Sequence, residues 1–357
     1  MDKKIVLLKG DGIGPEIVDA SIKVLKAIEK KYKHKLNLVE RLVGGASYDK
    51  DGTPLTDETI KTCKSADAVL LGAVGGPKWD GEDVKKELRP EQGLLKLRKE
   101  LDLYANLRPA KIFESLKEDS PLKDSILEKG IDFVIVRELV GGIYFGDRKT
   151  YKENDLLTAY DVEKYNEKEI KRIGKMAFET ARKRNKKLSL VDKANVLDSS
   201  KLWRKVIKDL AKDYEDVELN FLYVDNCAMQ LIANPSQFDV ILTNNIFGDI
   251  LSDESSILTG SLGMQASASI SSFGVNMYEP IHGSAPDIAG KNIANPIATI
   301  LSLSMMLDYS FSLKDEAKDI NEAVRKVLDQ GYRTKDIANG KDFLTTDEIT
   351  EKIIENI

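Results

Sequence analysis

The sequence FDVILTNNIFGDILSD, residues 238–253, joins an apolar, strand-like run to a segment that carries Asp249 and Asp253 four positions apart. Residues separated by four share one face of a helix, so the two carboxylates converge if this segment is helical. Two carboxylates that close repel each other unless a cation lies between them, and hard oxygen ligands suit Mg²⁺ or Mn²⁺. Taken alone, the pair has a simpler interpretation, in which two acids near the start of a helix complement its dipole.

Charged residues follow other apolar runs in the same way. Strand-like segments elsewhere in the chain lead to Arg137, to Lys193 and to Asp225. In an open parallel sheet, ligands bind beyond the carboxyl ends of the strands. An arginine, a lysine and several aspartates at one such edge predict a site for an anionic substrate and a divalent cation.

The composition of the 357-residue chain is that of a large globular protein, with 42% hydrophobic residues and a net charge of −5. This length predicts two domains. Because the net charge is negative and gives no sign of a basic surface, nucleic acid is not expected as a partner. Cys63 and Cys227 lack the spacing of a zinc site or a disulfide framework and suit a reducing cytoplasm. No apolar run has the length of a signal peptide or a membrane span, so we expect a cytoplasmic protein without a membrane partner.

Apolar strand-like runs alternate with amphipathic helical patterns along the chain, which predicts an α/β fold. The first unit consists of a strand, the glycine-rich loop GDGIGPE at 10–16, and a helix from about 15 to 31. This loop lacks the GxGxxG spacing of a Rossmann dinucleotide site, because Pro15 or Ile17 falls where the third glycine is needed. We therefore expect a tight strand-to-helix turn near a ligand site, and not a Rossmann domain.

A second glycine-containing segment, EPIHGSAPDIAG at residues 279–290, is the better candidate for dinucleotide binding. Small residues let the backbone approach a ligand closely. The Asp287 carboxylate can accept hydrogen bonds from a ribose diol and would repel a 2′-phosphate. The alternative is a proline-containing loop with a capping aspartate, and this segment alone does not decide between the two.

Arginines indicate how an anionic substrate is held. Arg98, Arg108 and Arg137 each offer a planar guanidinium that suits a carboxylate, so together they predict a dicarboxylate site. Leu94 precedes Arg98 by four residues and shares its helical face, where it can contact a branched alkyl group. Ordinary core packing is the alternative for Leu94.

Several blocks of sequence occur in a fixed order along the whole chain. They are GDGIGPE at 10–16, LGAVGGP at 71–77, RELVGGIYFG at 137–146, DKANVL at 192–197, the block around Asp249, and the loop from His282 to Pro296. With these blocks the chain resembles the β-decarboxylating dehydrogenases of the isocitrate/isopropylmalate family over nearly its full length. One departure is Lys9, where a proline is usual, and this position lies outside the proposed contacts.

The resemblance implies a role for each candidate residue. Asp249 and Asp253 would hold Mg²⁺ or Mn²⁺ together with Asp225 of the partner subunit, and Lys193 of the partner subunit would be the base relay. Tyr144 would be the acid that protonates the enol carbon. The substrate-binding residues implied are Leu94, Arg98, Arg108, Arg137 and Asp225. The NAD-binding residues implied are Asn195, His282, Gly283, Ser284, Ala285, Pro286, Asp287 and Asn295.

The fold implied by the resemblance has two α/β domains with a mixed sheet. Residues 1–103 and 260–357 would form a discontinuous cofactor-binding domain, and residues 104–259 a substrate, metal and dimerisation domain. The polar stretch 144–163, with two short strand-like pieces, would be an arm that pairs across a homodimer, although its pattern also fits a surface hairpin.

The implied reaction is NAD-dependent oxidative decarboxylation of (2R,3S)-3-isopropylmalate in leucine biosynthesis. Relatives that act on homoisocitrate, isocitrate, D-malate or tartrate share the same charged residues and remain alternatives, as does a non-catalytic regulatory subunit. The apolar wall at Leu94 favours an isopropyl group over a polar substituent.

Overall fold

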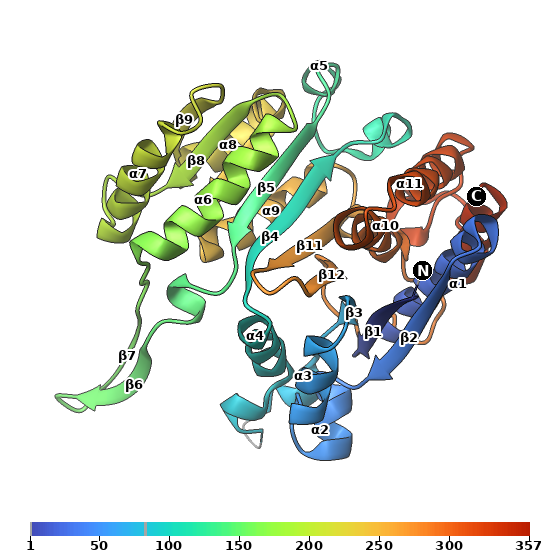
Figure 1. Ribbon diagram of the computed structural model, residues 1–357, viewed down its shortest axis with the longest axis horizontal. Coiled ribbons are helices and arrows are strands. Elements are labelled where there is room, and N and C mark those ends of the chain that lie inside the picture. Colours follow the sequence, from blue (N-terminus) through green and yellow to red (C-terminus); the bar gives the residue numbers. More distant parts are fainter. Residues whose placement is uncertain (1, 82–83) are drawn as a thin grey trace. The chain divides into compact units, whose positions relative to one another are not determined.

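The computed structural model describes residues 2–81 and 84–357 (Figure 1). These residues form two compact units: unit 1 comprises the chain up to Leu103, Ile112–Pro121 and Ser256–Ile357, and unit 2 comprises Tyr104–Lys111 and Leu122–Ser255. The sequence-based ranges had grouped residues 112–121 with the second domain. In the structure, Arg333 Nη2 donates to the Ser115 carbonyl at 2.6 Å, which ties this segment to unit 1.

Unit 1 contains five strands in the order β2-β1-β3-β12-β11. Neighbouring strands are parallel except β11 and β12, which are antiparallel. All six residues of β3 are buried, as expected for a parallel strand that is covered on both faces. The strands are β1 (Asp2–Gly10), β2 (Lys35–Arg41), β3 (Ala68–Ala73), β11 (Ala266–Ser271) and β12 (Asn276–Pro280).

Helices surround the sheet of unit 1. Helix α10 is buried on most of its surface and packs against β11, β12 and α11, so it forms the centre of the core. Helix α1 packs against β1, β3 and α12. The helices of this unit are α1 (Gly14–Tyr32), α2 (Gly45–Asp51), α3 (Asp57–Lys64), α4 (Pro90–Glu100), α10 (Ile297–Phe311), α11 (Lys314–Asp329) and α12 (Thr346–Glu355).

Unit 2 contains the strands that lead to the charged residues. The order is β4-β5-β10-β8-β9, with β4 antiparallel to β5 and the other neighbours parallel. The four parallel strands therefore end at one edge, as predicted from the sequence. The strands are β4 (Leu103–Lys111), β5 (Asp132–Glu138), β8 (Lys187–Asp192), β9 (Glu218–Tyr223) and β10 (Val240–Thr243). The predicted α/β fold with a mixed sheet is confirmed.

Helices cover both faces of this sheet, with α6 in front of the strands and α8 and α9 behind them in Figure 1. Helix α6 begins with a capping box, in which Asn166 accepts from the Glu169 amide and Glu169 accepts from the Asn166 amide. Its apolar face packs against α7, β5 and β10. The helices are α5 (Asp124–Leu127), α6 (Glu167–Arg182), α7 (Asp198–Ala211), α8 (Val224–Ala233) and α9 (Asn245–Leu258).

The polar stretch predicted as a hairpin or arm forms a separate two-stranded antiparallel sheet, β6 (Arg148–Glu153) and β7 (Leu156–Asp161). It projects from the rest of unit 2 in Figure 1. Leu156 and Leu157 at its tip are more than two-thirds exposed. None of the helices in the described ranges combines the length and the apolar character that crossing a membrane requires.

Candidate active site

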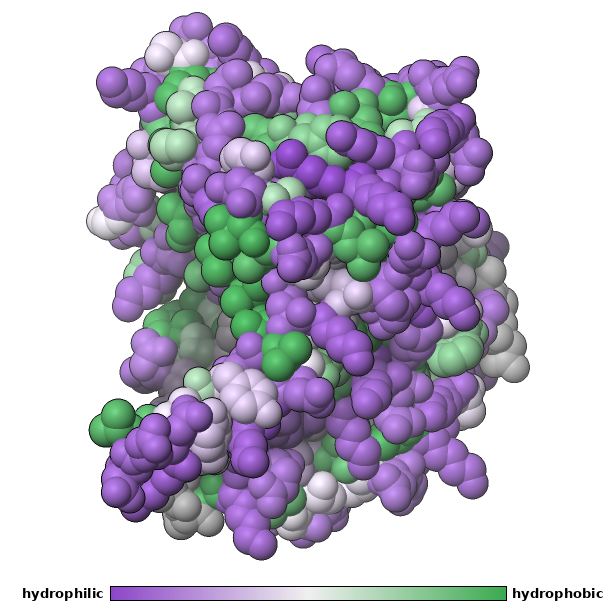
Figure 2. All heavy atoms as spheres, turned by 90° about the vertical axis from the view of Figure 1, so that its left-hand side faces the viewer, coloured by the Kyte–Doolittle hydropathy of each residue, from purple (hydrophilic) through white to green (hydrophobic). Residues whose placement is uncertain are grey.

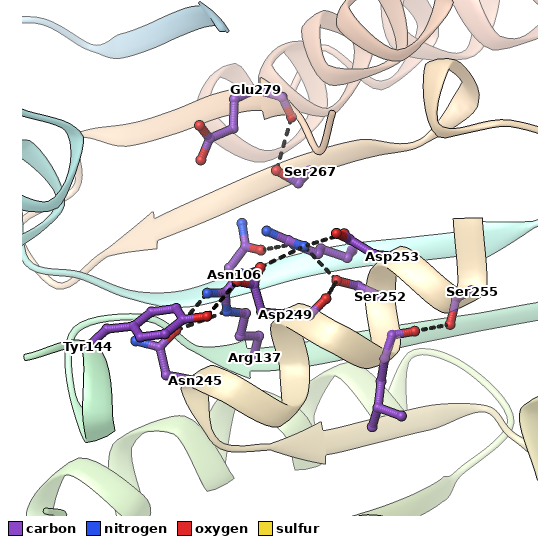
Figure 3. A network of polar contacts seen from close by, with 12 residues as sticks. Asn106, Arg137, Tyr144, Asn245, Asp249, Ser252, Asp253, Ser255, Ser267 and Glu279 are labelled. Carbon is purple, nitrogen blue, oxygen red and sulfur yellow. Dashed lines mark hydrogen bonds and ion pairs between the residues drawn. The ribbon is translucent and has the colours of Figure 1, made fainter. Parts of the chain in front are cut away.

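The carboxyl ends of the parallel strands in unit 2 bring together arginine, tyrosine and aspartate side chains (Figure 3). Arg137 is the penultimate residue of β5 and donates through Nη1 to Asp249 Oδ1, while Tyr144 Oη donates to Asp249 Oδ2 at 2.8 Å. Nη1 of Arg108 lies 3.6 Å from one carboxylate oxygen of Asp249 and 3.6 Å from one of Asp253. The spacing of the two aspartates therefore does place both carboxylates on one side of α9.

Both arginines are buried, since Arg108 is 5% exposed and Arg137 is 1% exposed. A buried guanidinium is costly unless it is paired and hydrogen-bonded. Arg108 Nε donates to Asn106 Oδ1 and its Nη1 donates to Ser252 Oγ, each at 2.5 Å. These neutral partners fix the orientation of Arg108, whose guanidinium also lies within ion-pair distance of Asp249 and Asp253.

A glycine allows α9 to start against Arg137. A Cβ added at Gly248 would lie 2.6 Å from Cγ and 2.8 Å from Cβ of Arg137. These atoms belong to the buried stem of the arginine, so they cannot move aside. The glycine in the sequence block around Asp249 is therefore required by the close approach of α9 to the end of β5.

Burial and charge determine the protonation of the acidic groups in the cluster. Burial, followed by the charge of Asp249, raises the pKa of Tyr144 to about 12, so the phenol stays protonated and can donate. Burial also raises the pKa of Asp253 above its usual range, and the nearby Arg108 opposes that shift.

Lys193 and Asp225 form a second charged pair in unit 2. Lys193 follows β8, Asp225 lies in the first turn of α8, and Nζ donates to Oδ1 at 2.6 Å. The hydrogen bond from Lys193 lowers the pKa of Asp225 below its usual range. Within residues 2–81 and 84–357, no group of three His, Cys, Asp or Glu side chains is arranged to hold a metal ion. Within one chain, Asp225 therefore does not complete a cluster with Asp249 and Asp253.

The two glycine-containing loops meet in unit 1. The Ile13 amide donates to the Ser284 carbonyl at 2.8 Å, and Ser284 Oγ donates to the Gly75 carbonyl at 2.7 Å. The buried Asp11 carboxylate accepts from the amides of Gly45, Ala46 and Gly75, each at 2.8 Å. Sequence reasoning missed Asp11 as an organiser of these loops. The available signal was an acid enclosed by glycines in a tight turn.

Within the second loop, His282 offers a binding group to a ligand. Its Nε2 is buried and has no hydrogen-bond partner among the residues that the structure describes. Burial lowers the pKa of this imidazole below its usual value, so the ring is neutral at physiological pH. Asn295 donates through Nδ2 to Asp336 Oδ2 at 3.1 Å, and Asp287 is exposed.

The remaining candidates lie in both units. Arg98, on α4 of unit 1, donates through Nη2 to Glu279 Oε1 at 3.0 Å, and both side chains are largely buried. Leu94 lies one turn earlier on α4 and is half-buried. Asn195 is exposed in the turn between β8 and α7 of unit 2.

Comparison with known proteins decides the family. The family model described as isocitrate/isopropylmalate dehydrogenase matches residues 4–353. The chain belongs to this family.

Curated members of the isocitrate/isopropylmalate dehydrogenase family align with almost the whole chain. A protein of Clostridium pasteurianum named 3-isopropylmalate dehydrogenase is 56% identical, with 99% of each chain covered. One of the same name from Bacillus subtilis is 54% identical, with 99% of this chain and 96% of its own covered. Among solved structures, isocitrate dehydrogenase from Methylococcus capsulatus has a TM-score of 0.88 at 36% identity, with 99% of each chain covered.

Proposed function

We propose that the chain catalyses the NAD⁺-dependent oxidative decarboxylation of (2R,3S)-3-isopropylmalate to 4-methyl-2-oxopentanoate and CO₂, a step of leucine biosynthesis. The observation that carries this proposal is the convergence of two buried guanidinium groups, from Arg108 and Arg137, with Tyr144 around Asp249. Buried guanidinium groups suit a substrate that has two carboxylates. The names of relatives that are more than 50% identical support 3-isopropylmalate as that substrate.

Arg98, Arg108 and Arg137 would hold the substrate carboxylates. Leu94 would contact the isopropyl group. Isocitrate is the second candidate substrate, because the isocitrate dehydrogenase of Methylococcus capsulatus has a closely similar fold. Isocitrate carries a carboxymethyl group in place of the isopropyl group, and the third carboxylate that this group adds needs a polar partner. Leu94 offers none, so this side chain favours 3-isopropylmalate.

The chemistry of the donor set fits a hard divalent cation. Asp249 and Asp253 direct carboxylate oxygens toward the same side of α9, and Asp225 of the partner subunit would supply the third carboxylate. The buried His282 Nε2, which has no hydrogen-bond partner within the described part of the chain, and the neighbouring loop residues fit a dinucleotide. When bound, NAD⁺ would supply the hydride acceptor for the oxidation of C2, and a divalent cation would supply Lewis acidity.

The chain's own residues would move the protons of the reaction. Lys193 of the partner subunit accepts the proton of the C2 hydroxyl as C2 is oxidised to a ketone. The carboxylate on C3 then leaves as CO₂, and its bonding electrons form the C2–C3 double bond of an enolate, with the negative charge on the C2 oxygen. Tyr144 donates a proton to C3, which completes the product, and regains a proton from solvent. Its pKa of about 12 keeps the phenol protonated until that step.

We propose that the active form is a homodimer with shared active sites. Met229 and Ile232 lie one turn apart on α8 and are each more than half exposed, as is Ile250 on α9. Figure 2 shows hydrophobic side chains that reach the surface among hydrophilic ones on the face of the molecule at the left of Figure 1. A second copy that covers these side chains would remove them from water, and the exposed leucines of the β6–β7 arm offer a further contact.

The dimer is tested by placing charges in its proposed interface. We expect the double substitution Met229→Glu and Ile232→Glu to yield folded monomers without activity, because two buried carboxylates on each subunit would face the partner's apolar surface. Sedimentation velocity and circular dichroism measure assembly and folding, and turnover is assayed in parallel. Phe273→Glu is the matched control, since Phe273 is an exposed apolar residue of unit 1. An active monomer would refute the shared site.

The proposed reaction is tested by NADH formation with Mg²⁺ present. We expect kcat/KM to be highest for 3-isopropylmalate among 3-isopropylmalate, isocitrate, homoisocitrate and D-malate. We also expect NAD⁺ to be preferred over NADP⁺ by at least about tenfold, since repulsion between Asp287 and a 2′-phosphate of ~1.4 kcal/mol suffices for that factor. Substitution of Asp287→Lys with Ile288→Tyr should reduce this preference. A higher kcat/KM for a tricarboxylate such as isocitrate would overturn the proposal that Leu94 contacts an isopropyl group.

A further inference from the structure

Asn245 contacts Arg137 and the segment that carries Tyr144. It is the first residue of α9, directly after the turn from β10, and is 1% exposed. Its Oδ1 accepts from Arg137 Nε at 3.0 Å and from Arg137 Nη2 at 2.7 Å. Its Nδ2 donates to the Gly141 carbonyl at 3.0 Å. One buried amide therefore connects the end of β5 to the segment that carries Tyr144 (Figure 3).

The chemistry of the partners fixes which side of the amide faces each of them. A guanidinium can donate but not accept, so it must face Oδ1, whereas a carbonyl can accept but not donate, so it must face Nδ2. Asparagine satisfies both partners at once. An aspartate in the same place would add a second carboxylate beside Arg137, which already pairs with Asp249, and it would leave the Gly141 carbonyl without this donor. A neutral amide holds Arg137 without placing a second carboxylate beside it, in addition to that of Asp249.

The peptide units around Gly141 are held from two directions. The Gly141 amide donates to Glu138 Oε2 at 2.8 Å, and its carbonyl accepts from Asn245. Gly142 follows with a φ of +70°, a left-handed conformation that favours glycine, and the short helical turn Gly142–Tyr144 begins there. The hydrogen bonds at Gly141 therefore hold the backbone at the start of the turn that carries Tyr144.

Tyr165 connects Asn245 with Glu138, the two residues that hold Gly141. The backbone N–H of Asn245 donates to Tyr165 Oη at 3.0 Å, and the Tyr165 hydroxyl is hydrogen-bonded to the buried Glu138 carboxylate. A buried network in which each member is satisfied is rigid. This network lies outside the ligand contacts assigned above, so its function is to hold other side chains.

We propose that Asn245 is a positioning residue that sets Arg137 and Tyr144 in one arrangement for the same substrate. This inference rests on the proposed function, because Arg137 is taken to bind a substrate carboxylate and Tyr144 to donate the final proton. Loss of the amide frees two side chains with different tasks, so both binding and turnover suffer.

Asn245→Ser tests the proposal, with Asn244→Ser as the matched control. Asn244 is also buried and donates to Glu163 Oε1 at 2.5 Å, and its Oδ1 accepts from the Phe247 amide. Serine keeps that capping oxygen and loses the contact with Glu163. We expect Asn245→Ser to raise KM for 3-isopropylmalate and to lower kcat, with a combined loss of about 10–100-fold, the usual range for a group that supports a ligand. KM for NAD⁺ and both constants of Asn244→Ser should remain near wild type.

The possible outcomes separate this inference from the proposed function. A purely structural role for Asn245 would lower the melting temperature in both variants and leave the kinetic constants of the folded enzyme unchanged, which would overturn the inference. Asn245→Asp provides a second measurement, since it keeps the shape of the side chain and adds a second carboxylate beside Arg137, next to that of Asp249. It should raise KM for the dicarboxylate more than Asn245→Ser does. Wild-type enzyme that turns over none of the four 2-hydroxy acids would instead overturn the proposed function.

Discussion

Lys193→Ala is expected to lower kcat by about 10²–10⁴-fold, the typical contribution of a positioned general base. Lys193 lies at the carboxyl end of β8 and donates to Asp225 at 2.6 Å. Without the Lys193 amine, only water can accept the proton of the C2 hydroxyl. KM for 3-isopropylmalate should change little, because the arginines hold the carboxylates. Steady-state kinetics at saturating Mg²⁺ separate the two constants.

The control for this substitution is Lys201→Ala. Lys201 forms an exposed pair with Asp198 one turn away on α7, so its loss removes a charge from the same region without touching the site. We expect its kcat to match that of the wild type. If Lys193→Ala also retained wild-type turnover, the proposed base would be wrong.

Mixing two inactive variants tests whether Lys193 serves the neighbouring subunit. In a heterodimer of Lys193→Ala and Asp249→Asn, a shared arrangement leaves one site with both residues intact and the other with neither. Random pairing of equal amounts should therefore restore about a quarter of the wild-type activity in a two-fold symmetric dimer. If both residues acted within one chain, each site of the heterodimer would lack one of them, and no activity would return.

The sequence predicted those parts of the structure that depend on local pattern. Apolar runs placed Arg137, Lys193 and Asp225 at strand ends, and the parallel pairing of β5, β10, β8 and β9 gathers those ends at one edge of unit 2. The spacing of Asp249 and Asp253 predicted that their carboxylates converge, because helical periodicity depends on neighbours in the chain.

Contacts between distant segments were beyond such patterns. Asn245 reaches Arg137, 108 residues away, and Arg98 reaches Glu279, 181 residues away. An asparagine at the start of a helix is expected to be a cap, and the preceding residue, Asn244, does perform that function by accepting from the Phe247 amide. The sequence gives no sign that the next asparagine turns inward to a buried arginine, because that choice is made by the packing of α9 against β5.

Asp249→Asn is expected to abolish turnover through loss of the divalent cation. Asp249 lies next to Arg108, Arg137 and Tyr144, so its carboxylate is the most strongly paired acid of the proposed metal site. Near a protein surface, one pair of unit charges 4 Å apart is worth about 4 kcal/mol, so losing the contact with a doubly charged cation should weaken binding by at least about 10³-fold. Calorimetric titration with Mg²⁺ and Mn²⁺ measures this change directly.

Asp249→Asn also removes a negative charge from beside two arginines. It should therefore strengthen the binding of the anionic substrate while it weakens the binding of the metal ion. With Asp249 neutral, the guanidinium groups of Arg108 and Arg137 lose an anionic partner and should attract a dicarboxylate more strongly. We therefore expect Asp249→Asn to bind 3-isopropylmalate in the absence of metal at least as tightly as the wild type does, while it fails to oxidise it. Asp209→Asn, which removes an exposed acid paired with Lys212, should change neither property. Turnover by Asp249→Asn at ordinary Mg²⁺ concentrations would show that Asp249 acts as an anchor for the arginines and not as a metal ligand.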